Sequence, residues 1–311
     1  MHPAASVILF TASSGAGYGL LFLIALAAAF GLPLNSLYGA AASFLALGLI
    51  STGLLASTFH LGHPERAWRA LSQWRSSWLS REGVAAVATY LPAGIFLLGW
   101  LFPLPEALWK ASALLAALGA VATVICTGKI YASLKTIRQW HHPLVVPVYL
   151  LWGLATGALL AAALGPLGTA TDSFGYLAAG GLAALLLVKP LYWSSLASAK
   201  PGSTAETATG LGGIGKVRPL DYAHTARNYV MEEMGYRVAR KHARRLRGAL
   251  LVSLCLALLL SLGATLTAGW LSGGLALLAL ACGLLGVALE RWLFFAEAEH
   301  KVTLYYGATA A

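Results

Sequence analysis

The sequence predicts an all-α integral membrane protein with eight transmembrane helices, forming a single membrane domain over residues 1–311. Its 311 residues are 59% hydrophobic and 10% charged, with a mean hydropathy of +0.74, whereas a soluble domain carries about 25% charged residues. A helix needs about 20 apolar residues to cross the hydrocarbon core, and lipid satisfies no backbone polar group, so each long apolar run is expected to be one helix. The runs lie at approximately 7–30, 38–60, 83–102, 108–128, 144–164, 174–193, 248–269 and 272–295.

The first run is expected to be a retained helix rather than a cleaved signal. No Lys or Arg precedes it, and it is longer than the apolar region of a signal peptide. Its glycines Gly15, Gly17 and Gly19, in SGAGYG, are expected to permit close helix packing rather than to form a ligand-binding loop.

Charge sets the predicted orientation. An even number of spans places both termini on one side, called face X, together with the connections 61–82, 129–143 and 194–247. Of the 21 Lys and Arg residues, only Lys110 lies near the opposite face Y, so the positive-inside rule makes face X cytoplasmic in a bacterial inner membrane. Basic loops that dock an acidic partner would give the same bias. The net charge of +10 does not indicate nucleic acid, because it flanks the membrane spans.

The distribution of chemically active residues also points to face X. No ionisable residue occupies the middle of a span and no repeat relates the two halves, which disfavours a transporter. All eight histidines fall at or beyond face-X ends, which disfavours a haem at mid-depth. These are His2, His60, His63, His141, His142, His224, His242 and His300.

The three cysteines indicate no metal centre. Cys126, Cys255 and Cys282 lie far apart in apolar runs, without a C-x-x-C pair. We therefore expect no iron–sulfur cluster and no structural zinc held by this chain.

The long basic connection 194–247 contains GLGGIGKV at 210–217, which formally matches two nucleotide-binding motifs. A P-loop needs Ser or Thr after its Lys, but Val217 follows Lys216. A dinucleotide fingerprint needs a preceding strand and a following helix, and Arg218-Pro219 follows here. Both matches are therefore interpreted as false. The later segment YVMEEMGYRVARKHARRLRG is expected to be a basic helix leading into the seventh run, at the lipid headgroups or beneath a partner.

The connection FHLGHPERAWRALSQWRSSWLSREG at 59–83 concentrates ionisable residues between two apolar runs. Its apolar residues recur every three to four positions and predict an amphipathic segment in the interface, with Trp at headgroup level. These residues are Trp68, Leu71, Trp74 and Trp78. Its arginines then face water, lipid phosphate or protein; they are Arg66, Arg69, Arg75 and Arg81.

His60 ends the second run and Glu82 opens the third, at the same boundary. A His and a partly buried Glu suit a lipid-soluble substrate that exchanges protons with water, and quinone is the obvious candidate. Alternatively, His60 is an interface histidine and Glu82 a carboxylate stabilised by the helix dipole. On the residues alone, the structural interpretation is the favoured one.

Three segments resemble the anchor subunit family of dimethyl sulfoxide reductase, and the resemblance covers the whole chain. They are MHPAASVILFTASSGAGYG, HLGHPERAWRALSQWRSSWLSRE and KVRPLDYAHTARNYVMEEMGYRVARKHARRLR. The wider group includes polysulfide-reductase-like (NrfD) membrane anchors and the membrane subunit of a cytoplasmic sulfite dehydrogenase.

The resemblance implies a haem-free subunit that binds menaquinone or ubiquinone. Its implied partners are a ferredoxin-like subunit with four iron–sulfur clusters and a catalytic subunit with molybdopterin guanine dinucleotide. The quinone-site residues of the family correspond to His60 and Glu82, which makes a quinone site the favoured interpretation. By position at face X, the further candidates are Ser14, Tyr18, Tyr131 and Arg81.

Orientation bears on the substrate of the complex. A cytoplasmic face X fits a sulfite dehydrogenase, with electrons passing from sulfite to quinone. The alternatives are the anchor of a periplasm-facing dimethyl sulfoxide reductase, which oxidises quinol, and a purely structural anchor without a quinone site.

Overall fold

The computed structural model describes residues 3–59, 61–168, 171–198, 203–218, 220, 238–306 and 308. Within this part of the chain, eight helices are long and apolar enough to cross a membrane, which confirms the predicted fold class. They are α1 (Ala5–Ala29), α2 (Ser36–Thr58), α3 (Trp78–Leu101), α4 (Glu106–Ala132), α5 (Val145–Ala163), α6 (Thr171–Ser198), α9 (Val238–Leu266) and α10 (Gly269–Ala296). The shorter elements are η1 (Pro64–Gln73), η2 (Gly165–Leu167), α7 (Ala205–Thr209), η3 (Leu211–Gly213) and η4 (Lys301–Leu304).

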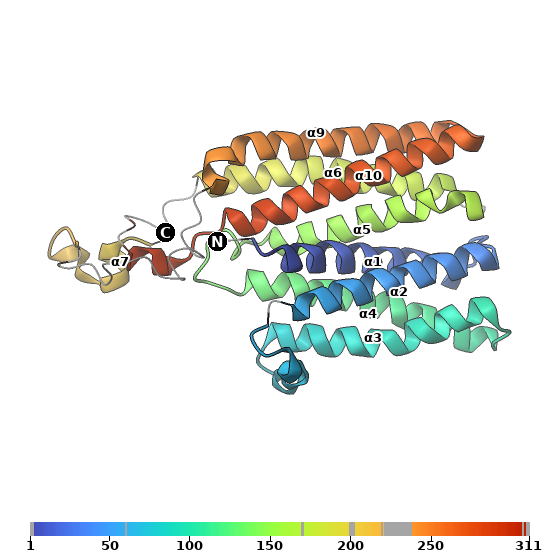
Figure 1. Cartoon of the computed structure of the whole chain (residues 1–311), viewed down its shortest axis with the longest axis horizontal. Helices are drawn as coiled ribbons and strands as arrows, with labels where there is room; N and C mark the ends of the chain where they lie inside the picture. The colour runs from blue at the N-terminus through green and yellow to red at the C-terminus, as the bar shows by residue number, and fades with distance from the viewer. Residues whose placement is uncertain are drawn as a thin grey trace.

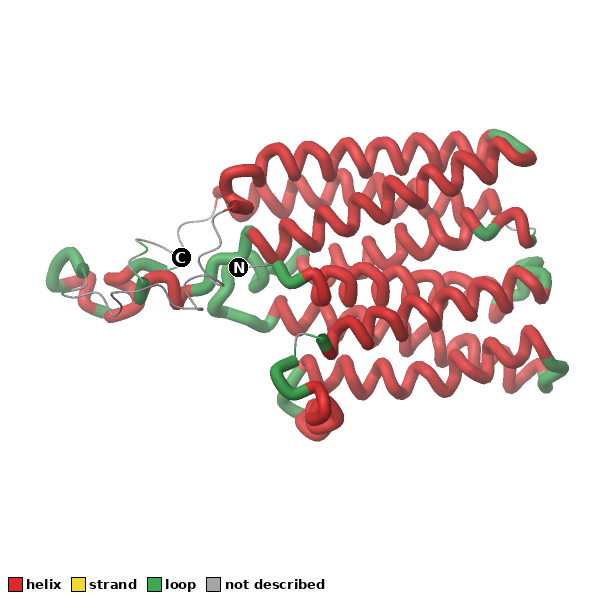
Figure 2. The backbone as a smooth tube through the Cα atoms, in the orientation of Figure 1, coloured by secondary structure: helices red, strands yellow, loops and turns green. Residues whose placement is uncertain are grey.

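The long helices run side by side, with their connections at the two ends of the bundle (Figures 1 and 2). Helices α1 and α5 lie in the middle, with α2, α3 and α4 on one side and α6, α9 and α10 on the other (Figure 1). Helix α1 begins and α10 ends at the same end of the bundle, beside η1 and α7. We keep the name face X for this end; its assignment to the cytoplasm stays a prediction.

Helix α1 packs closely against its neighbours because two of its glycines leave room for them. A Cβ at Gly17 would lie 2.7 Å from the Ala46 carbonyl oxygen of α2, and one at Gly19 would overlap the Gly153 carbonyl of α5. These positions confirm the predicted packing role. At Gly15 a Cβ would meet nothing within 4 Å, so close packing does not require a glycine at this position.

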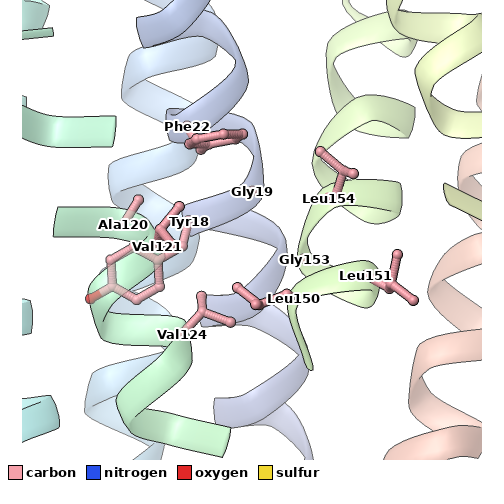
Figure 3. Close-up of a pocket in the computed structure, with 10 residues that line it drawn as sticks. All are labelled: Tyr18, Gly19, Phe22, Ala120, Val121, Val124, Leu150, Leu151, Gly153 and Leu154. Carbon is pink, nitrogen blue, oxygen red and sulfur yellow. The ribbon is translucent and has the colours of Figure 1, made fainter. Parts of the chain in front are cut away.

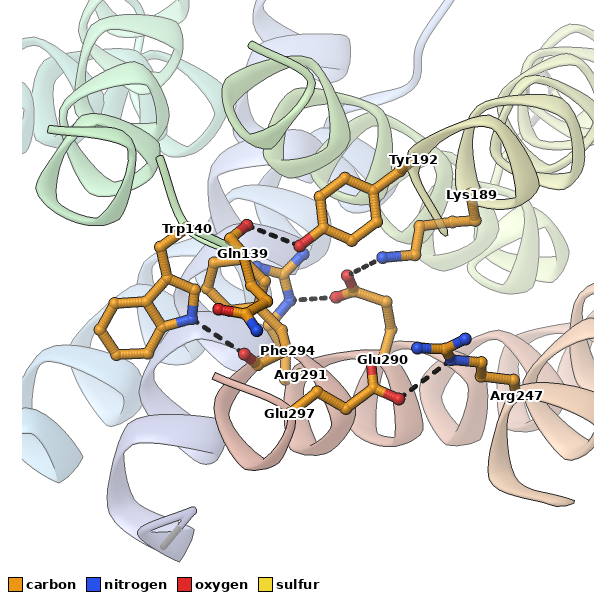
Figure 4. Close-up of polar contacts among 9 residues, drawn as sticks. All are labelled: Gln139, Trp140, Lys189, Tyr192, Arg247, Glu290, Arg291, Phe294 and Glu297. Carbon is orange, nitrogen blue, oxygen red and sulfur yellow. Dashed lines mark hydrogen bonds and ion pairs between the residues drawn. The ribbon is translucent and has the colours of Figure 1, made fainter. Parts of the chain in front are cut away.

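The face-X ends of α4, α5, α6 and α10 are joined by the connection 133–144 and the segment after α10. Ile137 and His300 form an antiparallel bridge, and the Lys301 N–H donates to the Thr136 carbonyl (3.1 Å). The Trp140 indole donates to the Phe294 carbonyl (2.9 Å), and the Tyr192 hydroxyl donates to the Gln139 carbonyl (2.7 Å; Figure 4). These bonds fix the C-terminal end of α10 against α4 and α6.

Element η1 occupies the predicted amphipathic segment as a 3₁₀ helix with no buried residue. Trp68 and Trp74 are largely exposed, and Arg69 and Arg75 lie over their rings. Their placement at lipid headgroups stays a prediction.

The described part of the long connection does not resemble a nucleotide site. Gly210 ends α7 with a positive φ of 72°, and η3 follows it. No strand precedes GLGGIGKV among the described residues, in agreement with a false match. Helix α9 begins at Val238, inside the predicted basic helix, while residues 221–237 lie outside the described residues.

Candidate functional site

Glu82 is a buried carboxyl in the first turns of α3, with only 4% of its surface exposed. Its Oε1 lies 2.5 Å from the Thr127 hydroxyl of α4. It forms no ion pair with any residue that the structure describes, so its one hydrogen-bond partner is a neutral hydroxyl. A buried carboxylate is costly without a cation or several donors around it, so this position is unusual for a purely structural acid.

The Thr127 hydroxyl serves two acceptors with one hydrogen. Its Oγ1 also lies 3.0 Å from the Thr123 carbonyl oxygen, one turn earlier in α4. A hydroxyl has one donor and two lone pairs. If Glu82 is ionised, Thr127 donates to the carboxylate; if Glu82 is protonated, it donates to Thr127, whose own hydrogen turns to Thr123. The pair can therefore remain hydrogen-bonded in both protonation states.

Tyr18, another predicted site residue, faces the same interior from α1. It is 2% exposed, its hydroxyl has no hydrogen-bond partner among the described residues, and it lies within electrostatic range of Glu82. Ser14 lies one turn away and is also buried, but its hydroxyl donates to the Phe10 carbonyl at 2.6 Å. Tyr18 makes no close hydrogen bond, although Thr123 of α4 lies near its hydroxyl. Its hydrogen can therefore turn to a ligand, whereas the Ser14 hydrogen is already used.

An apolar pocket of about 220 Å³ lies between α1, α4 and α5 (Figure 3). The Tyr18 ring forms one side, and its oxygen points away from the leucines of α5 on the other side. Gly19, Phe22, Val121, Val124, Leu151 and Leu154 are among the other residues that line it. Its lining suits a hydrocarbon chain.

Two other predicted residues are His60 and Arg81. His60 lies outside the described residues, next to Phe59, which lines a groove of about 340 Å³ between the ends of α1 and α2. Arg81 is engaged in the preceding connection: its Nε and Nη2 donate to the carbonyls of Trp74 (2.9 Å) and Arg75 (2.7 Å). Its position therefore has a structural explanation.

Tyr131 belongs to an aromatic cluster at the face-X ends of α4, α5 and α10. Its ring stacks on Tyr149 with 5.8 Å between centroids and meets Trp140, Phe294 and Phe295 edge-on. It is 8% exposed and lies within electrostatic range of Glu82. The structure thus brings Tyr18 and Tyr131 toward Glu82 from two sides.

A second buried group, the triad Lys189–Glu290–Arg291, was not anticipated from the sequence (Figure 4). Lys189 Nζ lies 2.8 Å from Glu290 Oε1, and Arg291 Nε lies 2.6 Å from Glu290 Oε2. All three are at most 3% exposed. The sequence analysis counted Lys189 and Arg291 among the basic residues that set orientation and made no prediction for Glu290. Their burial could have been predicted from one feature of the sequence: all three lie inside apolar runs, in LLLVKPLYW and LLGVALERWLFFA.

Arg247 also has a partner within the protein that was not predicted. It was expected at lipid headgroups or beneath a partner, but its Nε pairs with Glu297 Oε1 at 2.9 Å, just beyond α10 (Figure 4). Its guanidinium also lies over the Trp193 ring of α6. This arginine therefore helps to join α9, α6 and the end of α10.

Comparison with known proteins identifies the family. Residues 1–198 match the family model described as DMSO reductase anchor subunit (DmsC). The chain belongs to the DMSO reductase anchor subunit family. It is 36% identical to a sulfite dehydrogenase subunit of Allochromatium vinosum (strain ATCC 17899 / DSM 180 / NBRC 103801 / NCIMB 10441 / D), over the full length of both chains. It is also 32% identical over 118 residues to the anaerobic dimethyl sulfoxide reductase chain YnfH of Escherichia coli (strain K12), covering 37% of this chain and 41% of that one.

The anchor family fits the eight-helix fold, and the predicted family resemblance is confirmed. The chain is a membrane anchor subunit of an oxidoreductase complex of the sulfite dehydrogenase or dimethyl sulfoxide reductase type. In the described part of the chain, no three His, Cys, Asp or Glu residues gather as metal ligands. That this anchor carries no haem and no iron–sulfur cluster stays a prediction.

Proposed function

We propose that this anchor subunit binds menaquinone or ubiquinone near face X, between α1, α3 and α4. There it exchanges electrons between the quinone pool and a ferredoxin-like partner with four iron–sulfur clusters. Substrate chemistry takes place in a further subunit that holds molybdopterin guanine dinucleotide. The observation that carries the proposal is Glu82, a buried carboxyl whose bond to Thr127 suits both protonation states.

The residues around Glu82 fit a quinone. A bound quinone supplies redox chemistry in which two electrons and two protons are transferred. Glu82 holds or releases a proton at Oε1, and Thr127 keeps that oxygen oriented in either state. The Tyr18 hydroxyl, buried without a described partner, is available to donate to a ligand oxygen. His60, which follows α2 in the sequence, is the expected donor to the other oxygen.

The apolar pocket beside Tyr18 supports the same proposal. A quinone carries a hydrocarbon tail, and the pocket between α1, α4 and α5 offers a hydrocarbon lining next to the Tyr18 ring. The Tyr18 hydroxyl points away from the pocket's leucines (Figure 3). Tyr18 would thus separate an apolar space for the tail from a polar space for proton exchange.

For the substrate, we favour a sulfite dehydrogenase complex facing the cytoplasm. The sulfite dehydrogenase relative matches the whole chain, whereas the dimethyl sulfoxide reductase chain matches 37% of it. Twenty of the 21 Lys and Arg residues lie toward face X in the predicted topology, as expected for a cytoplasmic face. A periplasm-facing dimethyl sulfoxide reductase is the alternative. Protease accessibility of the catalytic subunit in spheroplasts and in inverted vesicles separates the two.

The test uses Glu82→Gln and His60→Ala in the assembled complex. We expect quinone-linked turnover to fall about a hundredfold or more, the usual contribution of a proton-transfer group. Turnover with an artificial dye, and the amount of assembled complex, should stay unchanged. Unchanged quinone turnover in both variants would show that the subunit is a structural anchor without a quinone site here.

A further inference from the structure

A small space lies between α1, α5 and α10, beside the buried triad. Thr11, Gly15, Tyr149, Trp152, Thr156 and Arg291 are among the residues that line it. Its volume is about 10 Å³, close to the space that one water molecule needs. This space is separate from the pocket beside Tyr18 and from Glu82.

Several hydrogen-bond donors around this space have no acceptor. Arg291 is 1% exposed; its Nε forms an ion pair with Glu290 Oε2, but Nη1 and Nη2 make no close hydrogen bond among the described residues, although the Tyr149 hydroxyl lies near the guanidinium. Trp152 Nε1 likewise has no hydrogen-bond partner among the described residues. The Arg291 guanidinium lies 3.7 Å from the centroid of the Tyr149 ring, which fixes its position. Buried donors nearly always have a partner, so an acceptor is expected here.

The same space also presents acceptors. The Thr11 hydroxyl donates to the Val7 carbonyl (2.9 Å), and the Thr156 hydroxyl donates to the Trp152 carbonyl (2.6 Å). Both hydrogens are therefore used inside their own helices. A hydroxyl oxygen keeps lone pairs when its hydrogen is engaged, so Thr11 and Thr156 can accept a further hydrogen bond.

We propose that this space is a binding site for one structural water molecule. Water accepts from Arg291 or Trp152 and donates to both Thr156 and Thr11. A halide could only accept, and it would face the lone pairs of both threonines. A cation would be repelled by Arg291. The water completes the hydrogen bonds of Arg291 and so keeps its Nε on Glu290, linking the triad to α1 and α5.

The test is a density map of the assembled complex at a resolution that shows buried water. We expect a peak within hydrogen-bond distance of an Arg291 Nη atom and of both Thr156 Oγ1 and Thr11 Oγ1. In crystals soaked in bromide, we expect no anomalous peak there. A bromide peak, or no density where other buried waters are visible, would overturn the proposal.

Thr156→Val tests the site through the protein. The change keeps the shape but removes an acceptor, so we expect the water peak to be lost and the midpoint of thermal unfolding to fall. Thr265→Val is the matched control, because the Thr265 hydroxyl also donates to a carbonyl of its own helix, that of Leu262 in α9. If the Thr156→Val protein does not accumulate in the membrane, the Thr11→Val variant is used instead, because it removes the other acceptor. A retained peak in these valine variants would contradict the assignment.

Discussion

Glu82 and Glu290 are two acids that the fold buries inside long helices, at 4% and 1% exposure. Glu290 has a cation on each oxygen, Lys189 at 2.8 Å and Arg291 at 2.6 Å. Glu82 has a single neutral partner, the Thr127 hydroxyl at 2.5 Å. The first environment holds the carboxylate as an ion, whereas the second can accommodate the gain and loss of a proton. Burial alone therefore does not distinguish a structural acid from a candidate for proton exchange; the hydrogen-bond and ionic partners do.

The two environments also imply different costs when a partner is removed. Breaking a buried ion pair leaves a charge without compensation and costs about 3–5 kcal/mol. Removing the Glu82 carboxyl leaves no unpaired cation behind, because Glu82 has no ionic partner among the described residues. The comparison between Glu290 and Glu82 can therefore be tested by the same substitution at both positions.

The largest effect is expected for Glu290→Gln, which leaves Lys189 and Arg291 buried together without an anion. We expect a loss of about 3–5 kcal/mol in the free energy of unfolding, seen as a lower melting midpoint and less anchor in the membrane. Glu82→Gln should cost less than about 1 kcal/mol, because it removes no ion pair. Equal losses in the two variants would contradict the distinction.

Replacing the whole triad sharpens this prediction. A variant with Lys189→Met, Glu290→Leu and Arg291→Met contains no buried charge at this position, and apolar replacements of buried ion networks are often neutral or stabilising. We expect it to be more stable than Glu290→Gln. If it is as unstable as Glu290→Gln, packing rather than uncompensated charge explains the loss.

The fold was predicted from the sequence, and the family resemblance pointed to Glu82, whose role in quinone chemistry stays a prediction. The triad was not predicted, and the reason is physical. A long apolar run specifies a membrane helix whichever helices it packs against. Lys189 and Glu290 are 101 residues apart, and their pairing depends on how α6 meets α10. Hydropathy does not encode which faces of two helices meet, so these charges looked the same as loop charges that set orientation.

The next prediction concerns Thr127→Val, which leaves Glu82 buried without its hydroxyl partner. If Thr127 orients Glu82 in both protonation states, quinone-linked turnover should fall roughly ten- to a hundredfold, since a hydrogen bond to a charged group contributes about 1.5–3 kcal/mol. Dye-linked turnover should remain. Ser112→Ala is the control, because the Ser112 hydroxyl also donates to a carbonyl of α4, that of Trp109. The same loss of quinone turnover in both variants would mean that any hydroxyl of α4 matters equally.

The smallest effect concerns two histidines at face X that the fold holds neutral. His142 Nδ1 accepts from the Leu144 N–H (3.2 Å), and its Nε2 lies 2.9 Å from the Ser195 hydroxyl. His300 Nδ1 accepts from the Val302 N–H (3.0 Å). A proton on either Nδ1 would face a backbone N–H. Partial burial lowers the pKa of both imidazoles below their usual 6.5.

The sign of the pH effect follows from these lowered pKa values. At neutral pH and above, both histidines are neutral in the folded and unfolded chain, and their bonds are fully present. Below about pH 6.5 the unfolded chain binds protons that the folded chain resists, so stability falls as pH falls through the lowered folded pKa values. One pKa unit is worth ~1.4 kcal/mol, and solvent screening of these partly exposed rings should keep the effect below about 1 kcal/mol.

The measurement is the melting midpoint of the solubilised complex between about pH 7.5 and 5. The double variant His142→Gln, His300→Gln should lose part of the acid sensitivity. His141→Gln should retain it, because His141 Nδ1 faces the Ala132 carbonyl (2.7 Å) and not a backbone N–H. If the double variant melts with the same pH dependence as the unaltered chain, the acid sensitivity arises from other groups. Glu82 then becomes the first to examine, because its carboxyl has no ionic partner among the described residues.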